Sequence, residues 1–235
     1  SARLDFEIAP ETWHALQQLG PSIERISAER IRYELERILK EGGGFAGLRM
    51  LQVLGLWSIL LPELKAPDAA IERFRSRRPL QPAVAWAGLC VDQDLSDPEV
   101  RALGQRMRLS RQLNERIIGI IRCARALFAY ETLQVWERKK LVRDDCYQDA
   151  RHLLSPDESA AESLAAAKKD KAAWSSLDLH PPTLLTGDDL TQAGFQPGPF
   201  FGKVLGEIEN LQLEGSMSTR SEALRYVSER AKQNA

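Results

Sequence analysis

The strongest constraint on the fold of this 235-residue chain is the helical spacing of apolar residues within residues 23–40. The spacing of four apolar residues, Ile31, Leu35, Ile38 and Leu39, places their side chains on one face of a helix. Ser27 precedes this run, and a serine hydroxyl in that position accepts hydrogen bonds from the free N–H groups of the first turn. The glycines at 42–44 end the run, because glycine adopts the left-handed conformation that closes many helices. We therefore predict an amphipathic helix with a defined start and end.

Helical signals of this kind recur along the chain, whereas the alternation of apolar and polar residues typical of strands is almost absent. Capping boxes open further helices at Ser96 and Thr186, since an acidic residue follows each hydroxyl at the third position. The predicted fold class is all-α: an elongated array of at least nine helices, with no sheet of more than two short strands. The main predicted helices are residues 10–19, 23–40, 45–56, 57–64, 82–89, 110–130, 134–142, 146–154 and 200–213.

Composition divides the chain into four regions, residues 1–64, 65–154, 155–182 and 183–235. Between residues 155 and 171 the apolar side chains are alanines and Leu164. Alanine favours helices but offers little side chain to pack, so we predict that residues 155–182 form a weakly packed helix or a linker. Pro181 and Pro182 mark the entry to the last region.

Basic and acidic residues nearly balance, 32 against 33, but their distribution is uneven. From Arg101 to Arg143 there are eleven Arg or Lys and three Glu, a local excess of eight positive charges. Such a stripe is either a solvated face paired with neighbouring acids or a surface that neutralises RNA phosphates, and the residues alone favour neither interpretation. The candidate RNA-binding residues in this stretch are Arg101, Arg106, Arg108, Arg111, Arg116, Arg122, Arg125, Lys139 and Lys140.

Motifs for metal binding, nucleophilic catalysis and phosphate loops are absent from the sequence. The cysteines lack metal-ligand spacing, and their odd number argues against a disulfide framework. The histidines are isolated from one another. We therefore predict no catalytic residue, metal ion or cofactor in this chain, which should be inactive alone. The three cysteines are Cys90, Cys123 and Cys146, and the three histidines are His14, His152 and His180.

Location also follows from missing signals. No apolar run approaches the ~20 residues that a membrane span needs, and the first residues do not resemble a signal peptide. Unpaired cysteines indicate a reducing compartment. We predict a cytoplasmic protein without a membrane partner, and the oligomeric state stays open.

The tail contains a possible phosphate-binding turn. A short helix opened by Thr186 is followed by Gln-Pro-Gly-Pro at 196–199 and then by a second helix. Backbone N–H groups at the start of such a helix can bind a phosphate, so Gly198 and Lys203 are further candidate RNA-binding residues. The alternative is that Gly198 only permits a tight turn between two helices.

Two motifs resemble one known family. Residues 25–39 read R-I-S-x-E-R-I-x-x-E-L-x-x-I-L, which resembles the neck motif of bacterial CCA-adding tRNA nucleotidyltransferases and the related poly(A) polymerases. The tail strings L-L-T-G-x-D-L, G-x-x-P-G-P-x-F-G and Q-L-E-G, within residues 184–215, are similar to the tail of the same family. The intervening basic helices match only in character.

The resemblance implies that this chain is the neck, body and tail of a longer enzyme, whose upstream head would hold Mg²⁺ and CTP or ATP. We accordingly expect the start of the chain to be the end of a helix, with exposed apolar side chains at Leu4, Phe6 and Ile8. The body and tail are expected to bind RNA, with the acceptor end of tRNA favoured. Residues expected to support the nucleotide site from the neck are Arg25, Ser27, Glu29, Arg30 and Glu34.

Two alternatives remain open from the sequence. Within the family the substrate could be the tRNA 3′ end or a poly(A) tail; the final residues, EALRYVSERAKQNA, carry little excess positive charge and favour tRNA slightly. Outside the family, the chain could be a helical adaptor that binds another protein. An exposed leucine-rich surface would favour the adaptor, whereas a continuous arginine groove would favour RNA binding.

Overall fold

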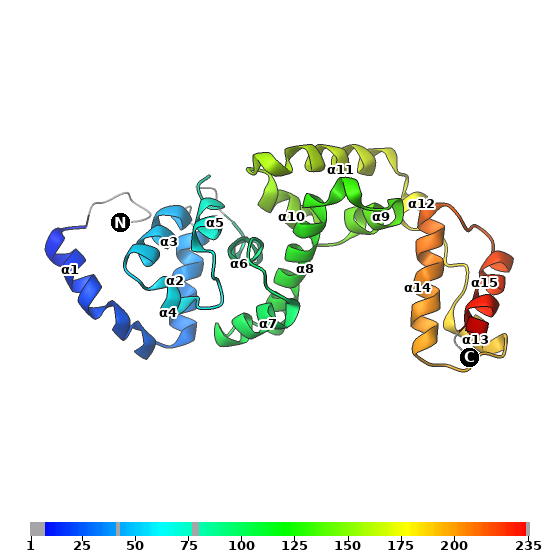
Figure 1. The fold of residues 1–235 in the computed structure, drawn as a ribbon, viewed down its shortest axis with the longest axis horizontal. Coiled ribbons are helices and arrows are strands. Elements are labelled where there is room, and N and C mark those ends of the chain that lie inside the picture. Colours follow the sequence, from blue (N-terminus) through cyan, green and yellow to red (C-terminus); the bar gives the residue numbers. More distant parts are fainter. Residues whose placement is uncertain (1–7, 41–42, 77–79, 234–235) are drawn as a thin grey trace. The chain divides into compact units, whose positions relative to one another are not determined.

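The computed structural model describes residues 8–40, 43–76 and 80–233. Within these ranges every regular element is a helix, comprising fifteen α-helices and three 3-10 helices, and there is no strand (Figure 1). The predictions of an all-α fold and of at least nine helices are therefore confirmed. A bilayer-spanning helix is not found among the described residues, because none combines the necessary length with apolar character.

The chain forms two compact units. The first combines the residues up to Phe128 with Cys146–Ala161, and the second combines Ala129–Asp145 with the residues from Glu162 onward. The backbone thus enters the second unit, returns to the first, and leaves it again. This division differs from the four consecutive regions expected from composition, because packing groups segments that are separated in the sequence.

The first unit contains nine α-helices and two 3-10 helices (Figure 1). Their bounds are α1 (Pro10–Leu19), η1 (Gly20–Arg25), α2 (Ala28–Lys40), α3 (Gly44–Val53), α4 (Trp57–Leu60), α5 (Pro67–Glu72), α6 (Pro82–Cys90), α7 (Asp97–Arg106), α8 (Arg111–Phe128), α10 (Tyr147–Leu154) and η3 (Glu158–Ala160). The second unit contains η2 (Tyr130–Thr132), α9 (Val135–Arg143), α12 (Ser176–Leu179), α13 (Gly187–Gln192), α14 (Pro199–Glu214) and α15 (Arg220–Gln233), and it takes in α11 (Ala161–Ala173) from its second residue onward.

The helix expected over residues 23–40 is two elements, η1 and α2, separated by an extended residue at Ile26. Ser27 caps α2 as predicted, because the Arg30 N–H donates to the Ser27 hydroxyl at 3.4 Å. Leu35 and Leu39 are buried at 3% and 1% exposure, so the apolar face inferred from their spacing is the face that packs. Helices α3 and α6 lie against α2.

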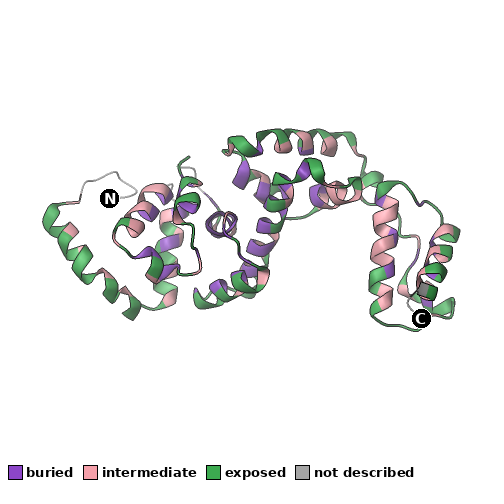
Figure 2. Cartoon of the chain, viewed as in Figure 1, coloured by how far each residue is buried: buried purple, intermediate pink, exposed green. Residues whose placement is uncertain are grey.

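Helices α6 and α8 form the centre of the first unit, and α7 and α10 pack against α8. Every residue of α6 from Val84 to Cys90 is buried, and Figure 2 shows this burial along the helix. The buried face of α8 holds Asn114, Ile117, Ile118, Ile120, Ile121, Cys123, Ala124 and Leu127. Helices α7 and α8 approach closely where Gly104 meets Asn114, whose amide nitrogen donates to the Arg101 carbonyl at 3.1 Å.

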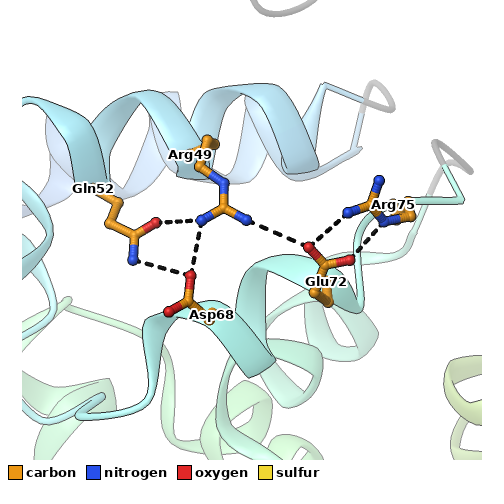
Figure 3. A network of polar contacts seen from close by, with 5 residues as sticks. All are labelled: Arg49, Gln52, Asp68, Glu72 and Arg75. Atoms are coloured by element: carbon orange, nitrogen blue, oxygen red, sulfur yellow. Dashed lines mark hydrogen bonds and ion pairs between the residues drawn. The ribbon is translucent and has the colours of Figure 1, made fainter.

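A surface network fixes α5 against α3 (Figure 3). Arg49 donates from Nη1 to both Gln52 and Asp68 at 2.8 Å. Its Nη2 reaches Glu72 at 3.4 Å, and Glu72 also accepts two bonds from Arg75. The bonds from Gln52 and Arg49 lower the pKa of Asp68, and the bond from Arg75 lowers the pKa of Glu72. Both carboxylates are thus already engaged within the unit.

The second unit has its own apolar core, formed by Leu185, Leu190, Val204, Ile208, Met217, Ala223 and Val227. These residues come from α13, α14, α15 and the segments that join them. Helix α9 is held to α14 by Lys139, whose ammonium group donates to the Leu213 carbonyl at 2.8 Å, and by Arg143, which donates to Glu209 at 2.5 Å. A lysine at the end of α14 also opposes the negative end of its dipole.

Residues 161–173, expected to be weakly packed, form the continuous helix α11 with one buried residue, Ala167. Lys171 and Asp170 hold it through polar contacts, Lys171 with the Val142 carbonyl and Asp170 with the Tyr130 hydroxyl. Helix α1 buries no residue at all, and it appears almost wholly exposed in Figure 2. Packing is therefore thinner in α1 than in α11.

At the start of the chain the described residues begin at Ile8. Leu4 and Phe6, expected to be exposed, lie outside the described residues. Ile8 is intermediate in exposure, and Leu19 at the end of α1 is 67% exposed.

The Gly104 contact gives a stability prediction. A Cβ at residue 104 would lie 2.5 Å from Cγ of Asn114, which is buried and hydrogen-bonded. We expect Gly104→Ala to lower the free energy of unfolding by about 1–3 kcal/mol, the usual cost of overpacking. Urea unfolding followed by far-UV circular dichroism measures this.

Gly206 in α14 is the control, because no heavy atom lies within 4 Å of a Cβ built there. Gly206→Ala should raise the free energy of unfolding by about 0.5–1 kcal/mol through helix propensity. A Gly104→Ala variant as stable as the wild type would contradict the close contact.

Candidate nucleic-acid interface

The arginines of the basic stretch have acidic partners both within the stretch and elsewhere in the sequence. Arg101 forms a two-pronged pair with Glu115, with Nε–Oε1 at 2.8 Å. Arg106 donates to both carboxylate oxygens of Glu63, at 2.7 and 2.6 Å. Folding thus adds carboxylates from other elements to the three glutamates within the stretch.

The polar face of α8 shows the same pattern. Arg116 donates to Asp149 of α10 at 2.7 Å, and Arg122 donates to Asp97 at the start of α7. Arg125 donates to two backbone carbonyls in the segment after α6, those of Gln93 at 2.6 Å and Leu95 at 3.0 Å. These arginines join neighbouring elements, and the charges of Arg116 and Arg122 are paired with carboxylates.

The lysines of α9 are also engaged. Besides the bond from Lys139 to α14, the Lys140 ammonium group donates to Asn210 at 2.6 Å and lies 2.9 Å from Glu209. Lys140 also lies over the ring of Trp136, 5.5 Å from its centroid. Both lysines were candidate RNA-binding residues, and the structure gives each a contact within the second unit.

Three of the candidate cations form no hydrogen bond with another described residue through their charged groups. The Arg111 guanidinium and the Lys203 ammonium group form no hydrogen bond or ion pair with the described residues, and both Arg111 and Lys203 are exposed. The Arg108 side chain is 69% exposed, and its nearest carboxylate, Glu29, is 3.8 Å away. Arg108 lies in the connection between α7 and α8, residues 107–110, which we call the α7–α8 turn, and Arg111 is the first residue of α8.

The neck helix α2 supports this turn through a residue that the sequence did not single out. Arg32 donates to the Arg108 carbonyl and lies 3.9 Å from Glu36. Glu36 in turn accepts a bond of 3.0 Å from the indole of Trp86 in α6. The signal for Arg32 was its helical spacing from Glu29 and Glu36, which puts the three on one face.

The other neck candidates are dispersed. Arg25 and Arg30 are exposed, and their guanidinium groups form no hydrogen bond or ion pair with another described residue. Glu34 lies 3.9 Å from Arg37 on the solvent side of α2. Of the five predicted neck residues, Glu29 is the one beside the α7–α8 turn, and Ser27 acts as the helix cap.

The tail turn differs from the expectation at Gly198. This glycine has an extended backbone, φ 175° and ψ −175°, which any residue can adopt. The left-handed conformation occurs instead at Gly194, with φ 91°, directly after α13. Gly198 is exposed, with no atom near a Cβ built there, and Lys203 projects from the first turns of α14.

The resemblance implies Mg²⁺ and a nucleoside triphosphate, so the described acids were tested against that chemistry. Two-metal transfer needs several carboxylates that converge on the ions. Among residues 8–40, 43–76 and 80–233, no three His, Cys, Asp or Glu side chains come together to hold a metal. Of the adjacent pair Asp188 and Asp189, the latter is committed to Thr186 and Arg220. The described residues do not fit the ions, and no catalytic step is assigned to them.

Two family models match the chain. Residues 5–67 match the family described as "Probable RNA and SrmB- binding site of polymerase A", and residues 80–227 match "tRNA nucleotidyltransferase domain 2 putative". The second match spans more than half of the sequence. The chain belongs to the tRNA nucleotidyltransferase domain 2 family.

Individual relatives agree with this assignment. The chain is 27% identical to a CCA-adding enzyme of Streptococcus sanguinis, over 97% of this chain and 57% of the relative. It is 26% identical to that of Levilactobacillus brevis, over 95% and 56%. The chain thus spans little more than half the length of these relatives.

Solved structures share the fold. One, described as the complex structure of CCA-adding enzyme with CTP, superposes with a TM-score of 0.59 at 21% identity, over 98% of this chain and 57% of that one. A second, the Thermotoga maritima CCA-adding enzyme complexed with tRNA, gives a TM-score of 0.54 at 21% identity, over 98% and 58%. At this identity the likeness supports the helical fold.

The tail capping box gives a pH prediction. Asp189 accepts from Arg220 at 2.6 Å and from the Thr186 N–H at 2.7 Å, and these bonds hold the pKa of its carboxyl well below the ordinary value. A carboxylate with a lowered pKa stabilises the fold above its unfolded pKa of about 3.9, and that stabilisation is lost as the pH falls. We expect the melting temperature to drop between pH 5 and pH 3, measured by circular dichroism.

Asp189→Asn is the matched variant, because it keeps the shape and removes the titrating group. It should melt lower than the wild type at pH 5, and the difference should shrink at pH 3. A constant difference between the two proteins across this range would contradict the role of the Asp189 charge.

Proposed function

We propose that this chain is the RNA-binding and RNA-orienting part of a template-independent nucleotidyltransferase that completes the CCA end of tRNA. The observation that carries the proposal is the family match over residues 80–227, with relatives named CCA-adding enzymes covered along nearly the whole of this chain. In this proposal, a head domain outside this chain would bring Mg²⁺ and CTP or ATP.

The exposed cations that form no hydrogen bond with another described residue favour contact with the phosphate backbone of the RNA rather than recognition of its base sequence. Exposed arginine and lysine bind phosphates irrespective of sequence, and structured RNA is recognised chiefly by shape. An arginine already paired with a carboxylate adds little net positive field, so the uncompensated cations carry the binding. Among the candidate RNA-binding residues, those whose charged groups form no hydrogen bond with another described residue are Arg108 and Arg111 in the first unit and Lys203 in the second. Arg25 of η1 and Arg30 of α2 are likewise exposed and unpaired among the described residues.

The tRNA acceptor end is favoured over a poly(A) tail by the relatives, whose printed names refer to CCA addition. The match of residues 5–67 to a family described by polymerase A keeps poly(A) synthesis as the second candidate. Competition between a tRNA and an oligoadenylate for the chain separates these two substrates.

A protein-binding adaptor has weaker support. The large apolar side chains exposed on the described residues include two leucines, Leu19 and Leu177, and they belong to different units.

We also propose a cytoplasmic location, since three cysteines are buried without disulfides and burial raises the pKa of the Cys90 thiol to about 12. Such thiols are unreactive and need no oxidising compartment.

Binding of a tRNA transcript lacking its 3′ CCA tests the proposal, using filter binding across a salt titration. The wild type should bind with an affinity that falls as salt rises. Arg111→Gln should weaken binding on the order of tenfold, the loss of about one charge-assisted hydrogen bond. It should also reduce the slope of log affinity against log salt by about 0.9, the value for one phosphate on a duplex.

Arg122→Gln is the matched control, because it lies on the same helix and removes the same charge, but from a side chain paired with Asp97. It should change the slope little. Equal effects of the two substitutions would indicate a general field rather than contact at Arg111. No measurable binding of tRNA by the wild type would contradict the proposed function.

A further inference from the structure

The backbone of Arg108 is in a conformation that costs free energy for any residue with a side chain. Its φ is 55°, and it is the one non-glycine residue with a positive φ in the described part of the chain. Here α7 ends in the manner of a glycine cap: the Leu109 N–H donates to the Gly104 carbonyl at 2.8 Å, and the Arg108 N–H donates to the Gln105 carbonyl at 3.0 Å. Glycine is the usual residue in this position, because a Cβ is unfavourable there.

The structure around the turn enforces this conformation from two sides. On one side, Leu109 lines a small internal space with Trp86 and Gly104, which anchors the chain just after Arg108. On the other, the Arg32 guanidinium donates to the Arg108 carbonyl. Strained backbone persists only where its surroundings over-determine it, and these contacts supply that constraint.

The Arg32 contact belongs to a chain of polar groups that reaches the core. Trp86 is 1% exposed, and its indole N–H donates to Glu36. Arg32 lies one helical turn before Glu36 on α2. The Arg32 side chain is 29% exposed, so it is held largely within the unit. The neck helix thereby fixes a carbonyl in the α7–α8 turn.

The Arg108 side chain, by contrast, is available for a ligand. Its guanidinium is 69% exposed and lies 3.8 Å from Glu29, beyond the range of a hydrogen bond. An arginine has five N–H donors in a planar arrangement that matches the oxygens of a phosphate. The next cation along the chain, Arg111, is exposed and forms no hydrogen bond or ion pair with another described residue through its guanidinium.

We propose that Arg108 binds an RNA phosphate and that Arg32 is the positioning residue that holds it in the left-handed conformation. This inference rests on the proposed function and adds to it a specific contact and its support. The strained conformation lowers the stability of the free protein, and in return it presents the Arg108 side chain to the phosphate. A purely structural Arg108, opposing the dipole at the end of α7, is the competing explanation.

Two substitutions at residue 108 separate these explanations. Arg108→Gly removes the charge and relieves the backbone, so the melting temperature should rise by about 2–4 °C. Arg108→Ala removes the same charge but keeps the Cβ, so the melting temperature should not rise. Both should weaken binding of a tRNA lacking its CCA end by roughly tenfold and flatten the salt slope by about 0.9. Arg108→Lys should retain most of the affinity.

Arg32→Met tests the positioning role, because methionine keeps an unbranched side chain and cannot donate to the carbonyl. It should weaken tRNA binding in the wild type but add little in the Arg108→Ala background, since the group that it positions is already gone. Equal losses in both backgrounds would overturn the assignment of Arg32.

The outcomes distinguish this inference from the proposed function. If the wild type binds tRNA and both Arg108→Gly and Arg108→Ala bind it as tightly as the wild type, the inference is overturned and the proposed function stands. A wild type that does not bind tRNA overturns both. A fall in melting temperature for Arg108→Gly would support the structural explanation and contradict the strained presentation.

Discussion

Burial of one face of α8 is the constraint on which the first unit depends. Ile117, Ile120 and Leu127 are at most 2% exposed, and α6, α7 and α10 all pack against this helix. Removing such side chains from water supplies the dominant stabilisation of a helical core. Once that face is fixed, the rotation of α8 fixes its arginines too, and each faces whatever acids the neighbouring helices carry.

Those neighbouring acids decide what the basic stretch can do. Arg116 and Arg122 meet aspartates of α10 and α7, and Arg125 donates to backbone carbonyls. Surface ion pairs of this kind stabilise only weakly, but they compensate the charge that RNA would otherwise see. The positive charge that remains available lies at the α7–α8 turn and the first residue of α8, because Arg108 and Arg111 form no hydrogen bond with a described residue through their charged groups.

Local features of the fold were predictable because they are written in neighbouring residues. The capping boxes at Ser96 and Thr186 open helices as expected, and the helix expected at residues 82–89 is Pro82–Cys90. The break at Ile26 was missed, because the helical periodicity continues across it. Gly198 looked like the position that needs glycine, but Gly194 takes the left-handed conformation after α13.

Features of the candidate interface that depend on distant residues could not be predicted. Glu63 and Arg106 are 43 positions apart, and Arg32 and Arg108 are 76 apart, so only folding brings them together. The strain at Arg108 follows from the length of α7 and the anchoring of Leu109, neither of which is visible in a list of residue types. The sequence thus identified the basic helices and the family motifs, whereas the structure separates the compensated cations from the uncompensated ones.

Hydrogen–deuterium exchange of the whole chain, with and without a tRNA lacking its CCA end, tests the central claim most directly. The claim is that RNA contacts the first unit at the uncompensated cations of the α7–α8 turn. The amides of residues 110–112, at the end of the turn and the start of α8, should exchange more slowly when RNA is bound, because Ser110, Arg111 and Gln112 are exposed in the free protein. Protection along the Arg116–Arg125 part of α8, with none at the turn, would contradict the account.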